Sequence, residues 1–256
     1  MDFDPRFWHK RFTQQAGWTT EVRRYILQNL RVNARTTLLE VGCGTGAILH
    51  PIYREGAHHV FGADISFAGL QFAHQRNPHL RLLCANGFQL PLRDHRFHIA
   101  LCHYFLLWVA DPLAVLLEMK RVTRPGGYLV VLAEPDYAQR EDQPPVLQKL
   151  GELQNMALLS MGARLDVGSH LQALFQQLDL QDVHVSMLKP APTKQRDRKA
   201  DSLEWQVIAY DLQHLVSQGH LTPQQVARYH QLDAEARADG SRLLHIPTYF
   251  GWARVP

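Results

Sequence analysis

The segment Thr37-Leu-Leu-Glu-Val-Gly-Cys-Gly-Thr-Gly-Ala47 is a short apolar run that passes directly into three closely spaced glycines. The run 37–41 predicts a buried strand, and a helical pattern follows the last glycine. Such a turn requires glycine because it adopts unusual backbone angles and leaves no side chain between the main chain and a ligand. Ligands of open α/β sheets bind at the carboxyl ends of strands, so this turn predicts a site for a nucleotide-like cofactor.

Outward from this turn, short apolar runs alternate with helical patterns over residues 31–135. We expect strands at 37–41, 59–63, 80–84, 97–102 and 128–133, and helices at 46–54, 66–75 and 112–122. Strands that alternate with helices at this spacing predict a parallel sheet covered on both faces. The expected core is therefore a doubly wound α/β domain.

The segments on either side of this core are predicted to be mainly helical. Residues 1–30 are rich in aromatic side chains and end in an amphipathic helix, and we expect them to form a lid. We interpret 136–256 as a substrate-binding elaboration that completes the sheet within one domain. It is predicted to contain helices at 147–160, 168–178, 203–218 and 222–238, a strand at 182–186, and a last strand in the tail 243–253. The last two helices form an insertion before that final strand.

The composition is that of a soluble globular protein. The chain has 256 residues, 46% of them hydrophobic, and 27 basic against 24 acidic side chains give a formal charge of +3. This charge is too small to favour nucleic acid or a membrane surface as a partner, and no apolar run reaches the roughly 18 residues of a membrane helix. Cys43, Cys84 and Cys102 are odd in number and scattered, so the sequence shows no disulfide framework, and we expect a reduced, cytoplasmic protein.

Two cofactor classes fit the glycine turn, because Gly42-x-Gly44-x-x-Ala47 also satisfies the dinucleotide-binding fingerprint. Glu40 distinguishes them. A carboxylate repels a pyrophosphate, and like charges ~4 Å apart at an effective dielectric of about 20 cost on the order of 4 kcal/mol. S-adenosylmethionine instead carries a cationic sulfonium and an ammonium group. The charge of Glu40 therefore favours S-adenosylmethionine and disfavours a dehydrogenase.

Two further strand ends supply groups for an adenosine cofactor. Asp64 ends the second predicted strand, where a carboxylate accepts hydrogen bonds from ribose hydroxyls. After the third strand, Asn86 has an amide oxygen that suits the adenine amino group, and Gly87 and Phe88 can line the ring. Asn-Gly is also a common turn sequence, so a purely structural role for Asn86 is the alternative.

The ordered set of these motifs resembles the class I S-adenosylmethionine-dependent methyltransferases. The resemblance covers about residues 36–135 and is closest to the ubiquinone/menaquinone-biosynthesis-like branch, which acts on small molecules. It implies a Rossmann-like, seven-stranded sheet, mostly parallel, with an antiparallel last strand beside the fifth. The segments that carry it are EVGCGTG (40–46), Asp64, ANGFQLPLRDHRF (85–97), LCHYFLLWVADP (101–112) and EMKRVTRPGGYLVVLAEP (118–135).

The same resemblance implies S-adenosylmethionine as cofactor, S-adenosylhomocysteine as product, and a set of binding residues. The implied cofactor-binding residues are Glu40, Gly42, Cys43, Gly44, Gly46, Asp64, Ile65, Asn86, Gly87 and Cys102, the last through its backbone carbonyl. The chain departs from the family at two positions, because Asn86 and His98 stand where relatives usually have an acid. Neither departure touches the glycine turn.

Methyl transfer from a sulfonium is an in-line displacement, so a base is needed only if the acceptor must lose a proton. The candidate catalytic residues are His103, just past the fourth strand, and Tyr137, just past the fifth, with Tyr104 and Asp136 beside them. His245 and Tyr249 of the tail are less favoured. We expect no metal, since the spacing of the histidines between 95 and 103 fits no standard ligand set.

The sequence thus predicts a methyltransferase that acts on a small, aromatic or lipid-like acceptor. Two alternatives stay open: a methyltransferase for RNA or protein, which the basic segment 189–199 would favour, and a cofactor-binding partner protein that has lost catalysis. A homodimer is one of the oligomeric states open to the chain.

Overall fold

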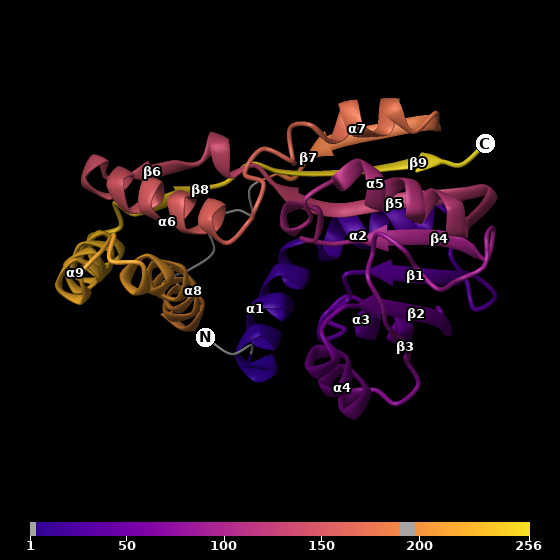
Figure 1. The fold of residues 1–256 in the computed structure, drawn as a ribbon, viewed down its shortest axis with the longest axis horizontal. Helices are drawn as coiled ribbons and strands as arrows, with labels where there is room; N and C mark the ends of the chain where they lie inside the picture. Colours follow the sequence, from indigo (N-terminus) through magenta and orange to yellow (C-terminus); the bar gives the residue numbers. More distant parts are fainter. Residues whose placement is uncertain (1–3, 190–197) are drawn as a thin grey trace.

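A computed structural model describes residues 4–189 and 198–256 and shows a single large sheet at its centre (Figure 1). Its strands are β1 (Thr37–Val41), β2 (His59–Asp64), β3 (Arg81–Cys84), β4 (Phe97–Cys102), β5 (Thr123–Pro135), β7 (Gln181–Met187) and β9 (Thr248–Arg254). They lie in the order β3-β2-β1-β4-β5-β9-β7. The first five strands are parallel, and β9 runs antiparallel to both β5 and β7. The predicted seven-stranded sheet with its antiparallel last strand is confirmed.

Alternate residues of the central strands point to opposite faces of this sheet. Leu39 of β1 packs in one hydrophobic core and Leu38 in the other, and Val131 and Val130 of β5 divide in the same way. Because both faces are buried, these strands consist of continuous apolar runs rather than an apolar–polar alternation. The sequence predicted the parallel sheet from the alternation of such short apolar runs with helical patterns.

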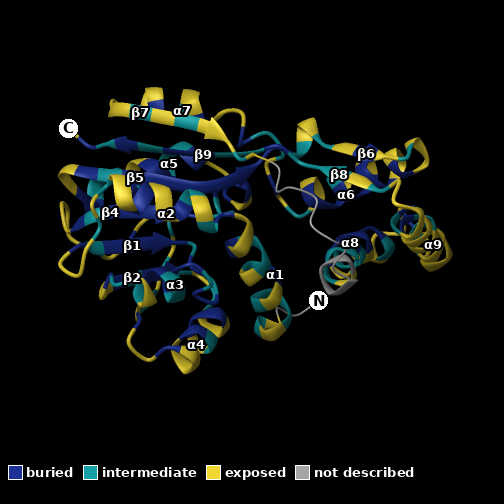
Figure 2. Ribbon diagram, turned by 180° about the vertical axis from the view of Figure 1, so that it is seen from behind, coloured by how far each residue is buried: buried dark blue, intermediate teal, exposed yellow. Residues whose placement is uncertain are grey.

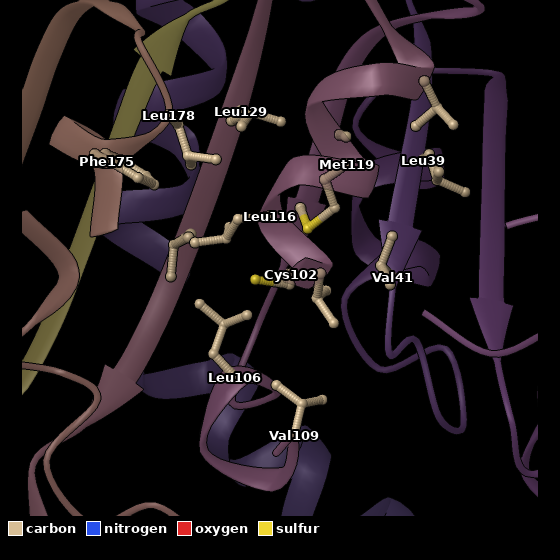
Figure 3. Close-up of a cluster of buried hydrophobic side chains, with 14 of the residues drawn as sticks. Leu39, Val41, Cys102, Leu106, Val109, Leu116, Met119, Leu129, Phe175 and Leu178 are labelled. Atoms are coloured by element: carbon tan, nitrogen blue, oxygen red, sulfur yellow. The ribbon is translucent and has the colours of Figure 1, made fainter. Parts of the chain in front are cut away.

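Helices cover both faces. α5 (Pro112–Val122) and α7 (Leu171–Gln177) cover one, and Figure 3 shows Leu116 and Met119 of this core near Cys102, with Phe175 beside Leu178. The other face is covered by α2 (Thr20–Asn29), α3 (Leu49–Arg54) and α4 (Phe67–Arg76).

A third hydrophobic core lies beyond the sheet. It is formed by α6 (Gln148–Ser160), α8 (Arg198–Ser217) and α9 (Pro223–Asp239), through side chains such as Leu150 and Leu212. Since α8 and α9 lie between β7 and β9 in the chain, the predicted helical insertion is confirmed. A small ribbon of β6 (Glu141–Gln143) and β8 (Leu243–His245) accompanies them. The sequence did not predict this ribbon, because β6 is three polar residues without alternation.

The N-terminal helix α1 (Pro5–Trp18) lies between the carboxyl edge of the sheet and α8 (Figure 1), and it contacts both α4 and α8. Arg11 of α1 and Glu204 of α8 form an ion pair with an N–O distance of 3.0 Å. Figure 2 shows that much of α9 and the edge strand β7 is exposed, whereas the central strands are buried. α1 therefore links the sheet to the helical elaboration.

Several predicted boundaries were wrong. The helix expected from 203 begins at Arg198, and the single last strand expected over 243–253 is two strands, β8 and β9, because residues 243–245 pair with β6 instead of β5. The structure gives the reason for two further differences. The helix expected from residue 46 begins at Leu49, because Gly46 has φ +72°, which no right-handed helix contains. β5 runs from 123 to 135 rather than from 128 to 133, because Thr123 pairs with β4 and Glu134 with β9 across two register shifts.

Candidate cofactor and acceptor site

A cavity of about 410 Å³ opens at the carboxyl ends of β1, β2, β3 and β4. Most of the predicted cofactor residues meet there: Glu40, Gly42, Cys43, Gly44, Asp64, Ile65, Asn86 and Gly87 line it. His103, Tyr104 and Phe105 contribute from the loop after β4, and Phe12 and Gln15 from α1. Residues far apart in the sequence converge here because parallel strands all end at one edge of the sheet.

The glycine turn after β1 is shaped by its close neighbours. Gly42 has φ +74°, and a Cβ there would lie 2.2 Å from the Phe105 ring. The backbone N–H groups of Gly42 and Cys43 both donate to the carbonyl oxygen of Ala63, at 2.8 and 3.1 Å. Glycine at 42 is therefore required twice, for its backbone angle and for the ring that packs on it.

Asp64 fixes the same turn from the end of β2. One of its carboxylate oxygens accepts a hydrogen bond from the Gly44 N–H and the other from the Ser66 N–H, each at 2.7 Å. Each carboxylate oxygen has a second lone pair, so both can still accept a ribose hydroxyl.

Glu40 is a buried acid with an unsatisfied oxygen. Its side chain is 2% exposed, lines the cavity, and has one carboxylate oxygen without a hydrogen-bond partner among the described residues. Burial, and then the negative charge of Asp64, raises the pKa of Glu40 well above its usual value, while Arg23 opposes that shift. A buried, unpaired carboxylate is costly unless a cation or a donor reaches it. The cavity is thus prepared for a positively charged group at this point.

The opposite end of the cavity is apolar. Ile65 is 74% exposed and Phe88 is 40% exposed, and both line the cavity, as a flat heterocycle would require. The Asn86 side-chain oxygen accepts the Phe88 N–H at 3.0 Å. Asn86 therefore has the structural role in a turn that was the alternative interpretation of its sequence, and its oxygen has one lone pair left for a ligand.

Two predicted residues do not line this cavity. Gly46 faces the opposite side of the turn, where a Cβ would lie 3.3 Å from both Ala73 and Leu80, so its role is close packing rather than access for a ligand. The Cys102 thiol points into the hydrophobic core (Figure 3), and its burial raises its pKa well above the usual value. The role predicted for its backbone carbonyl stays a prediction. The Cys43 thiol is also buried, with a raised pKa.

The two candidate catalytic residues lie in different cavities. His103 lines the cofactor cavity, and its Nε2 lies 3.1 Å from the Thr19 hydroxyl. Burial, and then the charge of Arg23, lowers the pKa of His103 to about 3. Tyr137 lines a neighbouring cavity of about 560 Å³, and burial raises its pKa. Tyr104 lines both cavities and so forms the wall between them.

Asp136, the other candidate acid near this position, has a structural role. It is buried and caps the turn that follows, with its two oxygens accepting from the backbone and side-chain nitrogens of Gln139 at 3.1 and 2.8 Å. Both oxygens thus have protein partners.

Glu134 positions the cavity wall, and the sequence analysis assigned it no role. Its buried carboxylate accepts backbone N–H groups from Phe105, Leu106 and Leu107, at 2.9, 2.9 and 3.2 Å. Burial raises the pKa of Glu134 to about 7, although these three hydrogen bonds oppose the shift. The sequence signal was an acid at the end of a buried strand, directly before a proline.

Two features are absent from the part of the chain that the structure describes: a metal-binding group of side chains and a membrane-spanning helix. No group of three or more His, Cys, Asp or Glu side chains there is arranged to hold a metal ion. No described helix is long and apolar enough to cross a membrane. Most of the basic segment 189–199, from 190 to 197, lies outside the described residues.

The strand order and the cavity at the glycine turn define a Rossmann-like methyltransferase fold. Residues 39–131 match the family model described as a methyltransferase domain. This match covers about a third of the chain, and it identifies the α/β core as a methyltransferase domain similar to the class I S-adenosylmethionine-dependent methyltransferases.

Its curated relatives share the core and differ in the acceptor that their names give. The demethylmenaquinone methyltransferase of Paenarthrobacter aurescens (strain TC1) is 30% identical over 115 residues, which are 45% of this chain and 45% of that protein. The malonyl-acyl-carrier-protein O-methyltransferase of Hamiltonella defensa subsp. Acyrthosiphon pisum (strain 5AT) is 29% identical over 119 residues, 46% of each chain. The aligned part spans about half the length of these relatives.

Among solved structures, the fold is similar to that of geranyl diphosphate C-methyltransferase from Streptomyces coelicolor A3(2), described in complex with Mg2+, geranyl diphosphate and S-adenosyl-L-homocysteine. The TM-score is 0.58 at 16% identity, and the match covers 92% of this chain and 78% of that one. At this identity the likeness concerns the fold alone.

Proposed function

We propose that this protein transfers a methyl group from S-adenosylmethionine to a small-molecule acceptor. The observation that carries the proposal is the buried Glu40 carboxylate, which lines the cavity and has one oxygen without a hydrogen-bond partner in the part of the chain that the structure describes. A cationic cofactor would satisfy that oxygen, whereas a diphosphate would be repelled by it.

The remaining residues of the cavity fit the other parts of this cofactor. Asp64 offers lone pairs for the ribose hydroxyls, and Ile65 and Phe88 offer apolar surface for the adenine ring. When bound, S-adenosylmethionine supplies an electrophilic methyl group, and its loss leaves S-adenosylhomocysteine as product. The protein would contribute by holding the acceptor in line and excluding water, which for well-oriented reactants is worth up to roughly 7–11 kcal/mol.

His103 is the candidate that can touch an acceptor next to this cofactor. A pKa of about 3 leaves its imidazole neutral, so it is a hydrogen-bond partner for the acceptor and only a weak base. Tyr137 faces the adjoining cavity, and its raised pKa keeps the phenol protonated as a donor. We therefore assign both residues to orienting the acceptor. H103Q and Y137F should lower kcat and leave the pH dependence of kcat unchanged. If one of these substitutions instead removes an ionisation from the pH profile, the replaced residue is a general base.

Calorimetry tests the cofactor assignment directly. The protein should bind S-adenosylmethionine and S-adenosylhomocysteine and show no comparable affinity for NAD; the reverse order would overturn the proposal. A screen for S-adenosylhomocysteine release with phenols, quinones, amines and RNA then tests methyl transfer. Cofactor binding without transfer to any of these would instead favour the non-catalytic partner protein.

A further inference from the structure

A cavity of about 300 Å³ lies on the opposite side of the glycine turn from the cofactor cavity. Its walls come from α1, α2, α3, the end of α4, and Thr45 and Gly46 of the turn. α1 contacts α4 directly, as Figure 1 also shows. Ala47 is the residue that the two cavities have in common. A ligand in this cavity would therefore lie behind the turn, apart from the residues assigned to cofactor and acceptor.

The charged and titratable side chains that line this cavity are all basic. His9 comes from α1, Arg23 from α2, His50 from α3 and Arg76 from the last position of α4. No acidic side chain of the described residues lines the cavity. We call it the basic cavity, since four helices each bring one basic group to it.

Arg23 is buried and incompletely paired. Its side chain is 2% exposed, and its Nε has no hydrogen-bond partner among the described residues. Its Nη1 donates to the carbonyl oxygen of Ala16 at 3.4 Å, and its Nη2 lies 3.6 Å from the carboxylate of Glu55. That carboxylate lies closer to Arg24, at 3.0 Å. Because a buried donor without an acceptor is costly, the unused N–H of Arg23 indicates a place for an external acceptor.

The other basic groups are close enough to repel one another. Arg76 is exposed and lies over the Phe72 ring, 5.8 Å from its centroid. Burial, and then the charges of Arg76 and His50, lower the pKa of His9. Burial, and then the charges of Arg54 and Arg76, lower the pKa of His50. An anion in the basic cavity would relieve this repulsion.

We propose that the basic cavity binds a tetrahedral oxyanion, either inorganic phosphate or the phosphate group of a small phosphomonoester. Basic groups approach from four helices, which suits the four oxygens of a tetrahedral anion better than the two coplanar oxygens of a carboxylate. The proposal concerns a site separate from methyl transfer, so it goes beyond the proposed function and does not depend on it.

The carboxylate of the cofactor is the competing occupant. Arg23 lies near enough to Glu40 to oppose the rise in the pKa of that acid. Glu40, however, lines the cofactor cavity, whereas Arg23 lines the basic cavity on the other side of the turn. This placement favours a second anion over the cofactor's own carboxylate.

Calorimetric titration tests the proposal. We would titrate inorganic phosphate and glycerol 3-phosphate into the protein at neutral pH and constant ionic strength, with glycerol as the uncharged control. At least one of the two phosphates should bind saturably, and at least about tenfold more tightly than glycerol. Tighter binding of glycerol 3-phosphate would identify a phosphomonoester as the ligand, and tighter binding of phosphate would identify the free ion. Absence of saturable binding for both would overturn the proposal.

Charge reversal provides the matched comparison. R76E should weaken binding of the preferred phosphate about tenfold, because it replaces an attractive charge at the cavity by a repulsive one. R228E makes the same exchange at an exposed position of α9 that does not line the cavity, and it should have no effect. Equal weakening by both variants would refute a local site. R76Q and R228Q serve in the same way if R76E folds poorly.

The buried arginine has its own test. R23K keeps the positive charge but lacks the planar set of N–H groups, so it should weaken phosphate binding about fivefold. Urea unfolding establishes that the variant is folded under the conditions of the titration. Unchanged affinity in folded R23K would overturn the proposal, which rests on the unused donor of Arg23.

A competition experiment separates the two anions. Phosphate should still bind to protein saturated with S-adenosylhomocysteine. If S-adenosylhomocysteine prevents phosphate binding and methylthioadenosine, which has no carboxylate, does not, the basic cavity holds the cofactor's carboxylate and the proposal is wrong. Arg76 does not line the cofactor cavity, so R76E should bind S-adenosylhomocysteine with the affinity of the parent protein. Failure of the parent protein to bind S-adenosylhomocysteine would refute the proposed function, and the phosphate titrations would still decide the basic cavity.

Discussion

A carboxylate oxygen of Asp64 lies 2.7 Å from the backbone nitrogen of Gly44. The end of β2 thereby holds the glycine turn that follows β1, and the same carboxylate faces the cavity. One residue thus both shapes the turn and offers lone pairs to a ligand, so its two roles can be separated only by measuring stability and binding together.

Replacing Asp64 with Asn should damage both roles. The amide can accept only one of the two N–H groups and turns its own NH2 towards the other, which is expected to cost about 1–3 kcal/mol of unfolding free energy. Affinity for S-adenosylmethionine should fall at least about tenfold, which corresponds to ~1.4 kcal/mol. Calorimetry and urea unfolding measure the two effects. D182N, at an exposed strand edge, is the control, and unchanged affinity in D64N would remove Asp64 from the site.

Replacing Glu40 with Gln should weaken cofactor binding without lowering stability, whereas D64N should lower both. The substitution removes a buried ionisable group, one oxygen of which has no hydrogen-bond partner among the described residues, so the ligand-free protein should be as stable as the parent or more stable. Affinity for S-adenosylmethionine should nevertheless fall about tenfold or more, because the cation loses its counter-charge.

The raised pKa of Glu40 adds a second readout. A folded-state pKa above the usual value means that this acid binds a proton more readily in the ligand-free protein, and a cationic ligand would favour the ionised form. Cofactor binding should therefore release protons and strengthen as pH rises. Calorimetry in two buffers of different ionisation enthalpy measures this release, which E40Q should reduce. Equal release in both proteins would contradict the role of Glu40.

Substitution of Gly42 by Ala should cost more than backbone strain alone. Gly42 and Gly126 have similar φ values, +74° and +72°, but only the new methyl group at 42 would meet the Phe105 ring. We expect about 1 kcal/mol for the left-handed backbone in G126A, and a further 1–3 kcal/mol, roughly, for overpacking in G42A.

A double mutant assigns that difference to the ring. Phe105→Leu should recover part of the stability lost in G42A, and the coupling between the two sites measures the clash. Equal unfolding free energies for G42A and G126A would show that the Phe105 contact has no energetic weight.

Local patterns predicted the sheet, the turn and most of the cofactor cavity. Continuous apolar runs mark strands buried on both faces, and the strand–glycine–helix order marks their carboxyl ends. The sequence alone therefore predicted that Glu40, Asp64 and Gly87 lie at the cavity. These features depend on residues close together in the chain.

Features that depend on distant partners were missed. Nothing near Glu134 in the sequence indicates that three N–H groups from the loop after β4 would converge on it. Tyr137 was placed near the cofactor by its position after β5, yet the chain turns there and carries it into the neighbouring cavity of about 560 Å³. Asn86 was ambiguous because a turn and an adenine contact require the same residue type.

The buried Asp211 predicts how stability depends on pH. Burial raises its pKa from 3.8 to about 7, and its Oδ2 accepts a hydrogen bond from the Gln154 side chain at 2.6 Å. The folded state therefore holds this proton more tightly than the unfolded state, so the stabilisation is complete below about pH 4 and is lost as pH rises through about 7.

D211N keeps the oxygen that accepts from Gln154 but cannot titrate. Between about pH 5 and 8 the parent protein should lose roughly 2–3 kcal/mol more unfolding free energy than D211N, measured by urea unfolding. D182N should follow the parent, and parallel pH profiles for D211N and the parent would show that Asp211 ionises normally in the folded protein.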